Sequence, residues 1–143
     1  MKLQQISVFL ANQPGALMEP CRLLSEAGID IRALCLADTQ QFGILRLIVA
    51  ERERAERILA EAGLVTRATE VLAVEIPDHP GGLTEVLAAL QDSGVSIEYM
   101  YAFAEGRVCK AVLIFRFDRP DAAMAALQAA GINVLAEVDI YAR

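Results

Sequence analysis

The stretch that decides the fold is Asn12-Gln13-Pro14-Gly15-Ala16-Leu17, and a related stretch occurs later in this chain of 143 residues. The second copy is Asp78-His79-Pro80-Gly81-Gly82-Leu83, so the glycine recurs after 66 positions (81 − 15 = 66). In each copy the proline fixes one backbone angle, while the glycine permits a conformation that other residues rarely adopt. Both stretches therefore predict a tight turn that leads into a helix.

The same spacing continues beyond the turn. Gly28 and Gly94 are again 66 positions apart (94 − 28 = 66), and each lies where a first helix would end. Gly63 and Gly131 are 68 positions apart (131 − 63 = 68). The second copy thus contains two extra residues between these landmarks, most simply in a hairpin. We interpret the chain as a duplication.

Apolar periodicity gives the order of elements in each repeat. In the first repeat it predicts a strand at 6–11, a helix up to Gly28, strands at 31–37 and 42–49 joined by a turn at 38–41, a helix at 52–62 and a strand at 65–69. In the second repeat it predicts a strand at 71–76, a helix from Leu83 up to Gly94, strands at 97–104 and 108–117 joined at 105–106, a helix at 120–130 and a strand at 134–141. Each repeat therefore has the order strand, helix, strand, strand, helix, strand.

This order predicts an α+β fold of two tandem ferredoxin-like βαββαβ domains. Each would have an antiparallel four-stranded sheet with two helices on one face. We place the domains at 1–69 and 70–143. Almost no linker separates them, so strands 65–69 and 71–76 can run as one long strand.

Composition narrows the class of protein. The formal net charge is −6, which does not suit a nucleic-acid binder. Charges interrupt every apolar stretch well short of a membrane span, and the N-terminus lacks the pattern of a secretion signal. We expect a soluble cytoplasmic protein. Cys21, Cys35 and Cys109 indicate reduced thiols, and with a single histidine we expect no metal site and no cofactor.

The turns themselves are candidate ligand sites. A helix points its free N–H groups and the positive end of its dipole at the preceding turn. A ligand carboxylate could bind the amides of Gly15, Ala16 and Leu17, or those of Gly81, Gly82 and Leu83. Asn12 and Asp78 could accept from a ligand ammonium group or cap the same helices. The alternative, that both stretches are only stable turns, stays open.

The second strands are the next candidates. In the second repeat Tyr99, Tyr101 and Phe103 share one face and Met100 takes the other, whereas the first repeat has the smaller segment Leu34-Cys35-Leu36. Tyrosine hydroxyls suit the edge of a pocket, although aromatic strands are more often core or oligomer contacts. With His79 and these tyrosines, the second repeat is the richer candidate.

The element order and the two turns resemble the ACT domain family of regulatory amino-acid-binding modules. The pattern Asp/Asn-x-Pro-Gly-x-Leu between a first strand and a first helix is typical of that family, and the resemblance covers essentially the whole chain. It implies a stand-alone regulatory protein whose ligand, an amino acid, binds between the turn of one domain and the second strand of its neighbour. Asn12 departs from the acidic residue common at its position.

Two other functions stay open. The protein could be an interaction module that uses exposed sheet edges, without a small ligand. Less favoured is a small enzyme, with His79 paired to a cysteine or serine, because no recognised catalytic motif surrounds it. Apolar strands on half-covered sheets also predict a homodimer.

Overall fold

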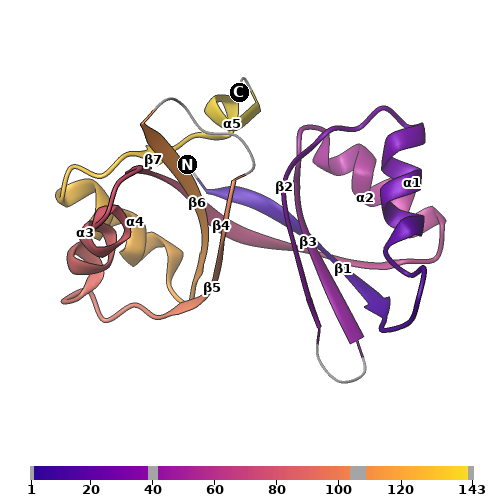
Figure 1. Cartoon of the computed structure of the whole chain (residues 1–143), viewed down its shortest axis with the longest axis horizontal. Helices are drawn as coiled ribbons and strands as arrows, with labels where there is room; N and C mark the ends of the chain where they lie inside the picture. The colour runs from indigo at the N-terminus through magenta and orange to yellow at the C-terminus, as the bar shows by residue number, and fades with distance from the viewer. Residues whose placement is uncertain (1, 39–41, 104–108, 142–143) are drawn as a thin grey trace. The chain divides into compact units, whose positions relative to one another are not determined.

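The computed structural model describes residues 2–38, 42–103 and 109–141 of the chain. These residues form two compact units (Figure 1). We call Gln4–Thr69 the N-terminal unit, and Lys2 and Leu3 together with the residues from Glu70 onward the C-terminal unit. Among the described residues, no helix is both long and apolar enough to span a membrane.

The N-terminal unit follows the predicted element order. Its elements are β1 (Leu3–Ala11), α1 (Met18–Glu26), β2 (Ile31–Asp38), β3 (Phe42–Val49), α2 (Arg52–Glu61) and the first part of β4 (Val65–Pro77). The strand order is β2-β3-β1-β4, and β1 and β2 are each antiparallel to β3. Both helices cover one face of this sheet (Figure 1).

The core of the N-terminal unit lies between the sheet and these helices. Alternate residues of β1, Ile6, Val8 and Leu10, point into it and are at most 5% exposed. They pack with Leu24 of α1 and Leu59 of α2. The period of two in the strand and the helical spacing thus bury one continuous apolar face.

The C-terminal unit repeats this arrangement. After the rest of β4 come α3 (Gly82–Leu90), β5 (Ile97–Ala102), β6 (Lys110–Phe117), α4 (Pro120–Ala129), β7 (Val134–Leu135) and α5 (Glu137–Tyr141). The strand order is β7-β4-β6-β5. Phe115 and Phe117 lie in its core with ring centroids 5.3 Å apart. The predicted pair of ferredoxin-like domains is confirmed, and β4 runs as one strand from one unit into the other.

Register locates the two extra residues of the second repeat. Leu36 pairs with Leu45 in the first hairpin, and Ala102 pairs with Leu113 in the second. The separations are 9 and 11 residues (45 − 36 and 113 − 102), so the extra residues lie in the β5–β6 hairpin as predicted. Residues 39–41 of the predicted turn at 38–41, the predicted turn at 105–106, and the strand ends at 104 and 108 lie outside the described residues.

The predicted closing strand at 134–141 is wrong beyond its start. Only Val134 and Leu135 pair with β4, and Glu137–Tyr141 forms the short helix α5. A side-chain carboxylate explains the change, because Asp139 accepts a hydrogen bond from the backbone N–H of Ala136 at 3.1 Å. This bond satisfies an N–H that a helix start would otherwise leave free. Ile140 is fully buried from α5.

Candidate functional site

The turn after β1 presents unpaired backbone N–H groups. Gln13 donates back to the carbonyl of Ala11 at 2.9 Å, and Gly15 has a left-handed backbone with φ of 84°. Ala16 then donates to Gln13 at 3.3 Å and Met18 to Gly15 at 3.1 Å. Within the described ranges, no hydrogen bond from the N–H of Gly15 or of Leu17 is present. These two groups precede the N-terminus of α1, where the helix dipole favours an anion.

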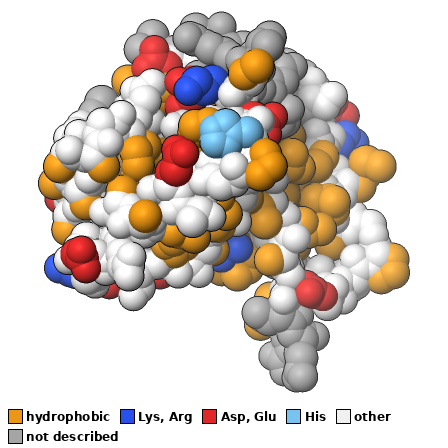
Figure 2. Space-filling view, turned by 60° about the vertical axis from the view of Figure 1, so that its left-hand side comes forward, with side chains coloured by type: hydrophobic (Ala, Val, Ile, Leu, Met, Phe, Trp, Pro, Cys, Tyr) orange, Lys and Arg blue, Asp and Glu red, His pale blue; other side chains and the backbone are white. Residues whose placement is uncertain are grey.

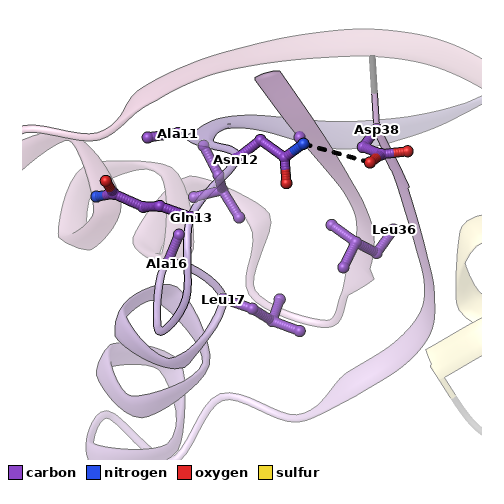
Figure 3. Close-up of a pocket in the computed structure, with 9 residues that line it drawn as sticks. Ala11, Asn12, Gln13, Ala16, Leu17, Leu36 and Asp38 are labelled. Carbon is purple, nitrogen blue, oxygen red and sulfur yellow. Dashed lines mark hydrogen bonds between the residues drawn. The ribbon is translucent and has the colours of Figure 1, made fainter. Parts of the chain in front are cut away.

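A cavity of about 290 Å³ lies beside this turn (Figure 3). Its walls come from the end of β1, the turn, the end of β2 and the start of β3. The residues that line it are Leu10, Ala11, Asn12, Gln13, Ala16, Leu17, Leu36, Asp38 and Gly43. This volume is at the lower end of the range for small-molecule sites.

The absence of a side chain at Gly43 helps to form the cavity. Gly43 is a cross-strand neighbour of both Leu10 and Asp38, so all three residues share the face that the helices cover. Gly43 is buried, and a Cβ built there would have only the ordinary contacts of 3.8 Å with Leu36 and 3.9 Å with Leu10. Gly43 therefore leaves space between the strand ends.

The cavity has one polar edge. The side-chain amide of Asn12 donates to a carboxylate oxygen of Asp38 at 3.4 Å, which joins the turn to the end of β2. Figure 3 shows the Asn12 carboxamide oxygen turned towards the space between Leu17 and Leu36, and Gln13 extending away from the Asn12–Asp38 pair. No ion pair of the described residues includes Asp38.

The opposite wall is apolar. Leu17 is 37% exposed and Leu36 is 52% exposed, both high for leucine side chains that line a cavity. Covering them with a ligand would remove apolar surface from water. The cavity thus has one carboxylate and an apolar wall, and it lies beside a turn with unpaired N–H groups.

The second turn is built differently. Gly81 is also left-handed, with φ of 93°, but α3 begins at the next residue, Gly82. His79 lies exposed at the surface (Figure 2), and its Nδ1 is 2.8 Å from the carbonyl oxygen of Pro80. The backbone N–H of Asp78 donates to the carbonyl of Cys109 at 3.0 Å. His79 therefore contacts its own turn, and the described residues contain no hydrogen bond between His79 and a thiol or hydroxyl group.

The start of α3 approaches the end of β4 closely. Gly82 is buried, and a Cβ at this position would overlap with the carbonyl oxygen of Pro77. The corresponding residue of the first repeat, Ala16, carries a Cβ and lines the cavity. A methyl group thus stands in the first turn where the second turn has direct contact between backbones.

The structure brings together only part of the predicted site. In the N-terminal unit Asn12, Gln13, Ala16, Leu17 and Leu36 line one cavity. Pro14, Gly15, Leu34 and Cys35 do not line it, although Pro14 and Gly15 shape the turn.

In the C-terminal unit Tyr99 and Tyr101 pair with Arg116 and Ile114, while Met100 pairs with the core residue Phe115. The tyrosines therefore occupy the face opposite the helices, away from the Asp78–Leu83 turn of their own unit.

Four lining residues were missed from the sequence: Leu10, Ala11, Asp38 and Gly43. Asp38 was assigned to the hairpin turn, but it is the last residue of β2. The signal was its spacing of two from Leu36, which puts both side chains on one face of a strand. Among the described residues no group of three or more His, Cys, Asp or Glu side chains could hold a metal ion.

Comparison with known proteins gives the family. The model of the ACT domain pair matches residues 1–142. The crystal structure of protein BT0572 from Bacteroides thetaiotaomicron is 34% identical, with a TM-score of 0.92 over 99% of this chain and 96% of that one.

The ligand-free regulatory subunit of aspartate kinase from Thermus thermophilus shares the fold at 18% identity and a TM-score of 0.63, over 89% of this chain and 91% of that one. The regulatory subunit from Thermus flavus does so at 20% identity and a TM-score of 0.58, over the same shares. No curated protein sequence matches the chain. The chain belongs to the ACT domain family, as a pair of ACT domains.

Proposed function

We propose that this ACT domain pair is a non-catalytic regulatory protein of the cytoplasm that binds an amino acid in the cavity of its N-terminal unit. One observation carries the proposal. The turn that carries Asn12 has unpaired N–H groups at Gly15 and Leu17, and the cavity beside this turn is lined by Asn12, Leu17 and the Asp38 carboxylate.

These groups match the two charges of an amino acid. A ligand carboxylate on the N–H groups of the turn would also gain from the dipole of α1. The ammonium group would then be held by oxygen atoms of Asn12 or Asp38. The ligand side chain would cover Leu17 and Leu36, whose exposure in the free protein is unfavourable.

The proposed site lies in the first repeat, whereas the sequence favours the second repeat as the ligand site because of His79 and its tyrosines. In the structure His79 contacts its own turn, and the tyrosines lie on the sheet face away from that turn. Ligand contacts of the second repeat, and a ligand held between paired domains, stay predictions.

The test is a thermal-shift screen with the twenty amino acids, followed by amide NMR titration of the full chain with any that stabilise it. By linkage, a ligand at 100 times its Kd stabilises the folded state by about 2.7 kcal/mol. The amides of Gly15 and Leu17 should shift on titration, and those of Gly81 and Leu83 serve as matched controls. A screen with no stabilising amino acid and no shifted amide would refute the proposal. Proton spectra of the ligand in the same samples would reveal any chemical change in it, which a non-catalytic protein does not cause.

A second candidate function rests on the edge of the N-terminal sheet. Strand β2 is an edge strand, and Leu34 and Leu36 on it are 47% and 52% exposed. Phe42, at the start of β3, is 55% exposed. Such an edge can pair with another chain, so we propose that the protein forms a homodimer. Sedimentation that shows only monomer at micromolar concentration would exclude it.

A further inference from the structure

We infer that Asp38 makes the cavity selective for ligands with a positively charged amino group and a compact, uncharged side chain. The inference rests on the proposed function and names the ligand class for the same site. The charge that selects the ligand is then the carboxylate of Asp38 at the end of β2, outside the turn.

The first argument is the electrostatics of Asp38. Its carboxylate lines the cavity, and its contact in the described structure is the neutral amide of Asn12 at 3.4 Å. The cationic side chains in the described ion pairs contact other carboxylates, so none of these pairs neutralises Asp38. An anion without an amino group, bound at the N–H groups of the turn, would be repelled by this charge. An ammonium group would be attracted and could form a charge-assisted hydrogen bond.

The second argument comes from the other repeat. In the second repeat the residue that corresponds to Asn12 is Asp78, so the acidic residue of that repeat lies on the turn. Because Leu36–Leu45 corresponds to Ala102–Leu113 in register, Asp38 corresponds in sequence to Ala104. Each repeat therefore has one acidic residue at these two positions. In the first repeat it is Asp38, at the end of the second strand, and in the second repeat it is Asp78, on the turn. Asp38 thus supplies a charge that Asn12 does not.

The remaining lining defines the size and polarity of the ligand side chain. Apart from Asp38, none of the residues that line the cavity carries a charge. Leu10, Leu17, Leu36 and the methyl of Ala16 surround about 290 Å³. An acidic ligand side chain would find no cation there, and an aliphatic one would cover the exposed leucines. The class is therefore small aliphatic α-amino acids.

The test compares ligands that differ by one charged group. L-leucine, 4-methylpentanoate, which lacks the amino group, and L-glutamate are titrated into the full chain by calorimetry and amide NMR. We expect leucine to bind at least about tenfold more tightly than either of the other two. The compound 4-methylpentanoate has no ammonium group for Asp38, and the side-chain carboxylate of glutamate finds no cation in the cavity.

The variants separate Asp38 from the rest of the site. Asp38→Asn keeps an acceptor for Asn12 but removes the charge, and it should weaken leucine binding at least about tenfold. Asp78→Asn removes the same charge from the other repeat and should change the affinity by less than about twofold. Adding Asn12→Asp to Asp38→Asn restores a carboxylate at the cavity and should recover part of the loss. Amide spectra of each variant check that the fold is intact.

The outcomes distinguish this inference from the proposed function. If an amino acid shifts the amides of Gly15 and Leu17 but Asp38→Asn binds it unchanged, the role of Asp38 is refuted and the proposed function stands. Equal binding of 4-methylpentanoate and leucine, or preference for glutamate, would refute the ligand class alone. If no amino acid binds at all, both are refuted.

Discussion

Gly82→Ala should destabilise the C-terminal unit, although replacing glycine by alanine in a helix usually does the opposite. Gly82 is the first residue of α3, and it is buried against the end of β4. An added Cβ would overlap with the carbonyl oxygen of Pro77 and lie 3.2 Å from the carbonyl carbon. Both atoms belong to the backbone of a paired strand, so they cannot rotate away as a flexible side chain could.

The expected magnitude is the difference between two terms. Alanine is favoured over glycine by about 1 kcal/mol in a helix interior, and by less in the first turn. Inserting a methyl group into a well-packed site costs about 1–3 kcal/mol. The net loss should be about 1–2 kcal/mol. With a urea m-value of about 1–2 kcal/mol/M for a small unit, the unfolding midpoint should fall by roughly 1 M.

Tyrosine fluorescence can follow this unit alone. The chain has three tyrosines and no tryptophan, and Tyr99, Tyr101 and Tyr141 all belong to the C-terminal unit. Urea unfolding monitored by this signal should show the lower midpoint. An unchanged or higher midpoint for Gly82→Ala would refute the close approach of α3 to β4.

Three further changes test other features. Gly43→Ala should stabilise the N-terminal unit by about 0.4–1 kcal/mol, because its Cβ has room, yet weaken ligand binding because it fills the cavity; far-UV CD melts and calorimetry measure the two effects. The pKa of Lys2 is raised above 10.5, first by Asp121 and then by Glu70. These ion pairs therefore contribute their full stabilisation of the folded state below pH 10.5, and this stabilisation is lost as the pH rises through the pKa of Lys2 in the folded protein. Lys2→Met should therefore reduce the fall of the urea unfolding midpoint at alkaline pH. Ile140→Ala should cost about 2–5 kcal/mol, because Ile140 is fully buried, and unchanged thermal unfolding would contradict its place in the core.

The predictable parts of the fold depend on local features that recur in both repeats, such as the glycine after each predicted helix. Gly28, Gly63 and Gly131 each follow a helix end within two residues and have positive φ, so each ended its helix where sequence placed the end. The closing segment failed because alternation of apolar residues over 134–141 fits a strand as well as a short helix. Asp139 decides between them through its bond to the Ala136 N–H, which periodicity does not report.

The candidate site was only partly predictable, because a cavity depends on the positions of backbones. The turn residues Asn12, Ala16 and Leu17 were identified from a local motif. Asp38 and Gly43 join the cavity through strand pairing, which places Gly43 beside both Leu10 and Asp38. The pairing of these strands cannot be read from the residue types alone. The sequence therefore does not predict that Asp38 and Gly43 lie beside the turn.

The two repeats differ at two positions that control the space beside the turn. Ala16 of the first repeat corresponds to Gly82 of the second, 66 positions later. Gly43 corresponds to Ala111, because Gly43 pairs with Leu10 and Ala111 pairs with Ile76. The methyl of Ala16 excludes the close backbone approach that Gly82 permits, and Gly43 leaves open the volume that a side chain would occupy. Ala111, in contrast, packs against the core of its unit. Both repeats keep the same strand order, so these two positions change the local space beside the turn while the fold is retained. This is the physical reason to expect the ligand in the N-terminal unit.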